Sequence, residues 1–164
     1  MILLRHATRS AVGVSDNSLN SMGEAQAQKL VKHLVPQGPL LVPTKLLASP
    51  KIRARETLDP LARAIHVPLK IDDRLDERNN GESREQFEER IVSLLEELTE
   101  ESARDPKSCA LLCTHLDWLE HAMVLMPSDM TDLETSAGWV TAEYRAFEIN
   151  EGVWSLTTEG AVAP

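Results

Sequence analysis

Residues 2–10, ILLRHATRS, contain an apolar run that ends abruptly in basic residues. Ile2, Leu3 and Leu4 predict a short buried strand, and Arg5 and His6 follow at its carboxyl end. In parallel α/β sheets, ligands bind where the carboxyl ends of the strands open into loops. The residues that follow each of the other predicted strands are therefore the first candidates for a functional site.

Two further apolar runs end in the same way. Residues 45–48 predict a strand that is followed by Ser49 and, one helical turn later, by Arg53. Residues 110–113 form the most apolar predicted strand, and His115 follows it closely. Because the carboxyl ends of neighbouring parallel strands meet at one edge of a sheet, we expect two arginines and two histidines to converge there.

Helical patterns separate these strands. Helices are expected to start at Asn20 or Ser21 with a Ser21/Glu24 capping box, at Ser49-Pro50, at a capping box of Ser83 and Gln86, and near Leu116. Residues 69–71 predict a short strand, 139–149 with 153–157 an antiparallel hairpin, and 158–164 a loose tail. The alternation predicts an α/β protein, a three-layer α/β/α sandwich around a mostly parallel sheet, in a single domain spanning 1–164.

Composition and charge exclude several classes of protein. The chain has 164 residues, 42% of them hydrophobic, which is enough to bury a core without disulfide or metal staples. A formal net charge of -9 has the wrong sign for a protein that binds nucleic acid or an anionic membrane. Basic residues nevertheless gather in 1–10 and 51–57, which favours a pocket for a small anion.

The sequence gives no sign of a metal site, a cofactor or export. Cys109 and Cys113 lie in the apolar run SCALLCT, where buried thiols are the simplest interpretation. No CxxC or HExxH motif occurs, so no metal and no cofactor are expected. The apolar start before Arg5 is too short for a secretory signal, and no run of 18 apolar residues occurs, so we expect a cytoplasmic protein.

Taken singly, each candidate residue also has a purely structural interpretation. A lone histidine after a strand is more often a hydrogen-bonded filler than a catalyst, and Arg53 fits a surface residue paired with Glu56 or Glu24. Asp76 and Glu77 lie in a charged loop, where solvation explains them. The order of the motifs along the chain decides between the two interpretations.

Five segments together resemble the histidine phosphatase superfamily, which includes the cofactor-dependent phosphoglycerate mutases. The segments are LLRHATRS (3–10), LNSMGEAQAQKL (19–30), ASPKIRARETL (48–58), LDERNNGES (75–83) and LLCTHLDWL (111–119). They are similar, in this order, to the strand with its R-H-G loop, an L-T-x-x-G-x-x-Q-A helix start, an S-x-x-x-R-A-x-x-T segment, an L-x-E-R-x-x-G loop and the second histidine. The resemblance extends over residues 1–126.

This resemblance implies a metal-independent phosphatase that forms a phosphohistidine. It makes His6 the nucleophile, with Arg5, Arg53 and His115 stabilising the phosphoryl oxygens. Glu77 is the expected general acid and base, which requires a protonated carboxyl group near neutral pH, kept so by desolvation or by a neighbouring carboxylate such as Asp76. Arg9, Asn20 and Ser49 are weaker candidates for contact with substrate.

The substrate stays open between two classes, a small phosphorylated metabolite and a phosphohistidine protein. Glu77 favours phosphate esters, because a phosphoramidate leaves without an acid. Leu116, where many members have glycine, resembles the short bacterial phosphohistidine phosphatases instead. Ala7, Asn20 and Glu56 also depart from the family pattern, and a non-catalytic phosphate-binding protein is a third alternative. Loops at 11–18, 77–84 and 127–138 are expected to set the choice.

Overall fold

The computed structural model describes residues 1–10, 16–35, 42–131 and 138–163. Their elements follow one another in the order β1 (Ile2–Arg5), α1 (Ser21–Leu34), β2 (Lys45–Ala48), α2 (Ile52–Ile65), β3 (Leu69–Ile71), a 3-10 turn (Asp73–Leu75), α3 (Arg84–Arg104), β4 (Ala110–Thr114), α4 (Leu116–Leu125), β5 (Glu143–Asn150) and β6 (Val153–Ala161). The predicted alternation of strands and helices is confirmed.

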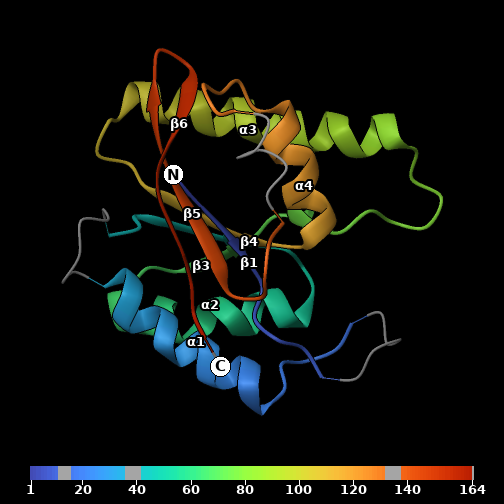
Figure 1. Ribbon diagram of the computed structural model, residues 1–164, viewed down its shortest axis with the longest axis vertical. Helices are drawn as coiled ribbons and strands as arrows, with labels where there is room; N and C mark the ends of the chain where they lie inside the picture. The colour runs from blue at the N-terminus through green and yellow to red at the C-terminus, as the bar shows by residue number, and fades with distance from the viewer. Residues whose placement is uncertain (11–15, 36–41, 132–137, 164) are drawn as a thin grey trace.

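The described strands form a single mixed sheet in the order β3-β2-β4-β1-β5-β6. The first four run parallel, whereas β5 and β6 are antiparallel to their neighbours. Helices α1 and α2 cover one face of the sheet, and α3 and α4 cover the other (Figure 1). This is the predicted three-layer sandwich, with an antiparallel hairpin added to a parallel centre.

The central strands are apolar because both of their faces are covered. All five residues of β4 are buried, and β1 is buried from Ile2 to Leu4. Continuous apolar runs of this kind are what parallel sheets with helices on both faces require. On the α1 side the core includes Leu4 and Leu111, and on the α3 side it includes Leu3 and Leu112, so neighbouring residues of one strand feed two separate cores.

Local signals explain where the helices begin, with two corrections. The Ser83 and Gln86 capping box at the start of α3 is confirmed. At α1 the cap is Asn20, whose side chain accepts a hydrogen bond from Gly23 N at 2.9 Å, so the expected Ser21 capping box is wrong. At α2 the N-cap is Lys51 without a side-chain bond, so Ser49 does not cap this helix. Its hydroxyl group is used elsewhere.

The carboxyl-terminal segment is also corrected. Residues 158–161 are not a loose tail but the end of β6, where Thr158 pairs with Ala146 and Ala161 with Glu143. Val162 is 2% exposed, and its carbonyl oxygen accepts a hydrogen bond from Gln26 Nε2 at 3.0 Å. The predicted strand at 153–157 is confirmed, but its continuation to residue 161 was missed because the small and polar residues of 158–161 carry little apolar signal.

Candidate active site

Three adjacent strands bring the predicted residues to one edge of the sheet. The register pairs Arg5 of β1 with Thr114 of β4, and Ala48 of β2 with Cys113 of β4. His6 N then donates to the Thr114 carbonyl oxygen at 3.0 Å, and Ser49 N donates to the Cys113 carbonyl oxygen at 3.0 Å. His6, Ser49 and His115 therefore start their loops side by side, as the sequence predicted.

His6 is held with one ring nitrogen bound to the protein. Its Nδ1 lies 2.8 Å from the Ala7 carbonyl oxygen, which can only accept, so Nδ1 carries the proton and Nε2 keeps its lone pair. Burial, reinforced by the positive charges of Arg53, Arg5 and Arg9, lowers the pKa of His6 to about 4. The ring is thus a neutral imidazole at neutral pH, the form that a nucleophile needs.

Ala7 fits the loop although glycine is usual in the family. Ala7 is not one of the described residues with a positive φ, so its backbone conformation does not require glycine. Its N–H donates to Thr57 Oγ1 at 3.0 Å, which ties the loop to α2. A glycine is required instead at Gly23, where an added Cβ would lie 2.0 Å from the Thr8 carbonyl oxygen.

His115 lies against His6, with 5.2 Å between the two ring centroids. Its Nδ1 is 3.1 Å from an Arg53 guanidinium nitrogen, which can only donate, so Nε2 carries the proton and donates to Ser49 Oγ at 2.7 Å. Burial, together with the charges of His6 and Arg53, lowers the pKa of His115 to about 2. Both ring nitrogens of His115 thus contact protein groups, and the expected hydrogen bond from His115 to a phosphoryl oxygen stays a prediction.

Arg53 is fully buried and connects the Glu77 loop with His115. Its guanidinium group donates to Glu77 Oε2 at 2.6 Å and contacts His115. The surface pairing with Glu56 or Glu24 considered from the sequence is wrong. Glu56 instead accepts a hydrogen bond from Leu19 N at 2.8 Å. A buried arginine held by a carboxylate and a histidine is a preorganised anion-binding group.

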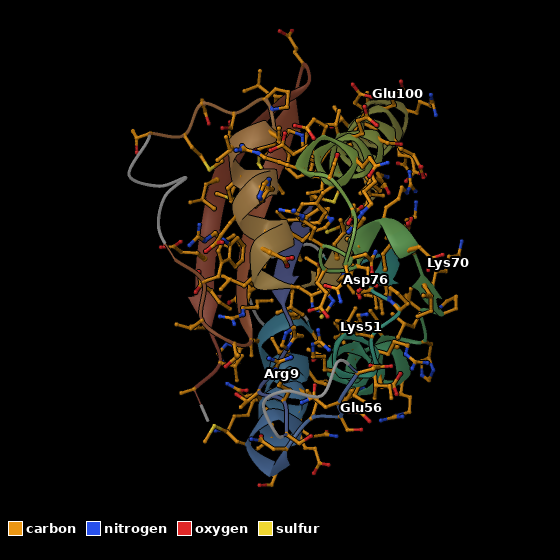
Figure 2. All side chains as sticks on the ribbon, turned by 90° about the vertical axis from the view of Figure 1, so that its right-hand side faces the viewer. Arg9, Lys51, Glu56, Lys70, Asp76 and Glu100 are labelled. Atoms are coloured by element: carbon orange, nitrogen blue, oxygen red, sulfur yellow. The ribbon has the colours of Figure 1, made fainter. Side chains whose placement is uncertain are left out.

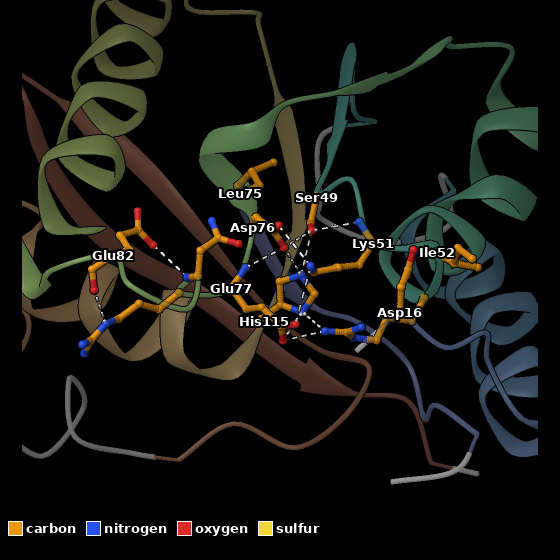
Figure 3. A network of polar contacts seen from close by, with 12 residues as sticks. Asp16, Ser49, Lys51, Ile52, Leu75, Asp76, Glu77, Glu82 and His115 are labelled. Atoms are coloured by element: carbon orange, nitrogen blue, oxygen red, sulfur yellow. Dashed lines mark hydrogen bonds and ion pairs between the residues drawn. The ribbon is translucent and has the colours of Figure 1, made fainter. Parts of the chain in front are cut away.

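Glu77 is surrounded by cations rather than by another carboxylate. Besides Arg53, Lys51 Nζ lies 3.8 Å from Glu77 Oε1. Asp76 is directed elsewhere: its Oδ1 accepts from Glu77 N at 2.9 Å and from Ser49 Oγ at 3.3 Å, and its Oδ2 lies 3.3 Å from Lys51 Nζ (Figure 3). The Glu77 carboxyl group is therefore paired with Arg53 and Lys51. The Asp76 carboxyl group, which the sequence suggested as its neighbour, contacts Ser49 and Lys51 instead.

Arg90, which the sequence analysis did not single out, holds this loop. Arg90 on α3 donates from NH1 to the Arg74 and Asp76 carbonyl oxygens at 2.8 Å each and from NH2 to the Glu77 carbonyl oxygen at 3.0 Å. Lys51 and Asp76 lie beside each other in Figure 2, far from Glu100 at the other end of α3. Only a long-range contact identifies Arg90, so no sequence signal could have found it.

The three weaker candidates, Arg9, Asn20 and Ser49, lie in different places relative to the cavity. Arg9 lines the same cavity as His6, whereas Asn20 is occupied as the cap of α1. Ser49 acts behind His115 rather than in the cavity. Residues 11–15 and 132–137 of the loops expected to set specificity lie outside the described residues.

These side chains open onto a cavity of about 310 Å³. It is lined by Arg5, His6, Arg9, Arg53, Glu77, His115, Leu116, Asp117 and Glu120. Arg5 is fixed by its guanidinium NH1, which donates to the Trp139 carbonyl oxygen at 2.5 Å. A larger cavity of about 440 Å³ between α1 and α2 contains none of the predicted site residues. In the described parts of the chain, no cluster of His, Cys, Asp and Glu suits a metal ion, and no helix could span a membrane.

The buried histidines lead to a prediction about stability. The unfolded chain binds a proton on His6 below its ordinary pKa of 6.5, whereas the folded ring stays neutral down to about pH 4. The free energy of unfolding therefore falls as the pH is lowered through this window. Relative to the native protein, His6→Gln should reduce the slope of the free energy of unfolding against pH by up to about 1.4 kcal/mol per pH unit, measured by denaturant titration at several pH values. Exposed His33→Gln is the control, and equal slopes for native protein and His6→Gln would contradict the prediction.

Comparisons with known proteins agree with this geometry. The family model described as histidine phosphatase superfamily (branch 1) matches residues 1–82, half of the chain. Among curated proteins no match was found.

Solved structures match over the whole chain at low sequence identity. A putative alpha-ribazole-5'-P phosphatase from Escherichia coli has a TM-score of 0.79 at 18% identity, covering 99% of this chain and 96% of that one. A mycobacterial glucosyl-3-phosphoglycerate phosphatase has 0.75 at 17%, covering 100% and 98%. A putative phosphohistidine phosphatase SixA from Agrobacterium tumefaciens has 0.71 at 21%, covering 98% and 96%. These matches confirm the fold, and with the family match and the two buried histidines they lead to one conclusion: this chain belongs to the histidine phosphatase superfamily.

Proposed function

We propose that the protein is a phosphatase that hydrolyses phosphomonoesters, without a metal ion, through a phosphohistidine at His6. The observation that carries the proposal is the neutral His6 ring with Nδ1 bound to the Ala7 carbonyl oxygen, in a cavity lined by Arg5, Arg9 and Arg53. A buried nucleophile among fixed cations is suited to phosphoryl transfer, where positioning and charge neutralisation supply most of the catalysis.

The first step would transfer the phosphoryl group to the protein. His6 Nε2 attacks phosphorus, the P–N bond forms, and the bond from phosphorus to the ester oxygen breaks. The Ala7 carbonyl oxygen accepts a hydrogen bond from Nδ1–H and stabilises the positive charge that the ring acquires. Arg5 and Arg53 donate hydrogen bonds to the non-bridging oxygens, and their planar guanidinium groups match that geometry.

Glu77 would supply and then remove the proton. The entering phosphate dianion competes with Glu77 for Arg53, and its negative charge favours the protonated carboxyl group. Glu77 then gives its proton to the leaving alkoxide. In the second step the Glu77 carboxylate takes a proton from water, the oxygen attacks phosphorus, and the bond to His6 Nε2 breaks to release phosphate.

His115 would act in its neutral form. Its hydrogen bond to Ser49 Oγ fixes the tautomer, and Asp76 fixes the Ser49 hydroxyl group in turn. This leaves Nδ1 to accept from Arg53 and to hold the guanidinium group in place. We therefore assign His115 to the positioning of Arg53.

The second candidate function is a phosphohistidine protein phosphatase, favoured by the phosphohistidine phosphatase SixA matches. Glu77 argues for esters, because its carboxyl group offers a proton transfer that a phosphoramidate leaving group does not need. The partner is accordingly a small phosphorylated metabolite in the first case and a phosphoprotein in the second. The cytoplasmic location and the third alternative, phosphate binding without catalysis, stay predictions from the sequence.

The test compares the two substrate classes in chelator-treated protein. We expect hydrolysis of both para-nitrophenyl phosphate and alkyl phosphates, with less activity toward a phosphohistidine peptide. A strict requirement for Mg²⁺ would contradict the mechanism. Phosphate binding without any hydrolysis would identify the non-catalytic alternative, and activity confined to the phosphohistidine peptide would identify the second.

Substitution of Glu77 by glutamine tests proton transfer. We expect Glu77→Gln to lower kcat/KM about 10²- to 10³-fold for alkyl phosphates but less than about tenfold for para-nitrophenyl phosphate, whose leaving group needs no proton. The measurement is the ratio of kcat/KM for the two substrates. Glu89→Gln, which makes the same change at an exposed position on α3, is the control. An equal loss on both substrates would show that Glu77 only positions Arg53.

A further inference from the structure

One wall of the cavity is formed by the first turns of α4. Leu116, Asp117 and Glu120 line the cavity from the first turns of this helix. Leu116 and Glu120 are four residues apart and therefore lie on the same face of the helix. A leaving group that extends beyond the phosphoryl site thus meets an apolar side chain and then a carboxylate.

The charges of the cavity do not favour a second anion. Its described lining contains three arginines, three carboxylates and two histidines whose pKa values are lowered. A bound phosphate dianion therefore leaves the site negative. The segments outside the described residues contain no lysine or arginine that could change this balance.

Glu120 is the carboxylate available to a ligand. Asp117 is occupied, since its Oδ2 accepts from Arg78 N at 2.8 Å and its Oδ1 from Trp118 N at 2.9 Å. Within the described part of the chain, no hydrogen bond or ion pair holds Glu120, whose side chain is exposed. The negative charge of Glu120 nevertheless acts on the phosphoryl site. Burial lowers the pKa of Arg5, and the Glu120 charge raises it.

We propose that Glu120 makes the enzyme select monophosphates whose leaving group carries a cation, and reject those that carry a second anionic group. The proposal rests on the proposed function, because it concerns the leaving group of the same reaction. Leu116 would pack against the short carbon spacer, and the Glu120 carboxylate would face the cation. Attraction of this kind, in a site open to water, is worth a factor of about five to ten in kcat/KM.

The experiment compares two substrates of the same shape. Phosphocholine and 3,3-dimethylbutyl phosphate differ only in the charge of the terminal group, and phosphoglycolate serves as the anionic probe. We expect kcat/KM to be about fivefold or more higher for phosphocholine than for its neutral analogue, and lowest for phosphoglycolate. The preference should shrink in 1 M NaCl, where the screening length is about 3 Å.

Glu120→Gln should abolish the difference between the two shape-matched substrates and raise kcat/KM for phosphoglycolate. Glu89→Gln, which removes an equal charge from an exposed position on α3, should leave the ratio as it is. Hydrolysis of para-nitrophenyl phosphate in the same preparations reports on the proposed function. If that ester is hydrolysed but the ratio is equal in native protein and Glu120→Gln, this proposal alone is overturned. If no ester is hydrolysed, the proposed function is overturned as well.

Discussion

Replacing His6 by alanine is expected to lower phosphatase turnover by about 10³-fold or more, to the background of the assay. The reason is chemical: no other described side chain in the cavity combines a neutral nitrogen lone pair with the position next to Arg5 and Arg53. His115 is committed through both ring nitrogens, to Arg53 and to Ser49. It therefore does not substitute for the lost nucleophile.

Two measurements make this expectation specific. Steady-state turnover of an aryl phosphate gives the loss of rate, and acid-labile phosphate on the quenched protein reports the phosphohistidine. Both should disappear in His6→Ala and remain in His33→Ala, which removes an exposed histidine from α1. A His6→Ala protein that is folded and still turns over at the native rate would exclude the mechanism.

Replacing Arg53 by lysine is expected to lower kcat/KM by about 10²-fold, although the charge is kept. One nitrogen of the guanidinium group, NH2, contacts both Glu77 and His115, whereas a lysine ammonium group has a different reach and lacks the other two guanidinium nitrogens. Its complete burial means that water does not replace the lost hydrogen bonds. The effect should therefore appear in kcat as well as in KM.

The chain offers a close control for this substitution. Arg55→Lys lies two residues further along α2 with its side chain exposed, and it should leave kcat/KM within about twofold of the native value. Denaturant titration of both variants separates a loss of fold from a loss of catalysis. Native activity in Arg53→Lys would mean that charge alone, without the geometry of the guanidinium group, is what the site needs.

Much of the architecture follows from local patterns in the sequence. Apolar runs such as 110–113 and caps such as Ser83 predicted the elements, since burial and capping depend on residues close together in the chain. The convergence of His6 and His115 followed from a general property of parallel sheets, that neighbouring strands end at one edge. The family motifs then added chemical roles to those positions.

The pairing of the side chains was decided by tertiary structure alone. Arg53 bonds to Glu77, 24 residues away, rather than to Glu56 on its own helix, because the Glu77 loop is held over the site by Arg90. The Ser49 hydroxyl group lies 3.3 Å from Lys51 N at the start of α2, but its shorter contact, at 2.7 Å, is with His115, 66 residues away. Such contacts depend on strand register and loop packing, on which local periodicity carries no information.

The same distinction, between local sequence pattern and tertiary packing, applies to the proposed reaction and to its choice of substrate. The order of residues along the chain was enough to propose a nucleophile, two arginines and an acid, because each follows a predicted strand or lies in a short motif. The lowered pKa of His6 depends on its burial, and the proposed choice of leaving group rests on the face that α4 turns toward the cavity. Both are properties of the packed molecule, since desolvation and charge proximity arise only when distant segments enclose the same space.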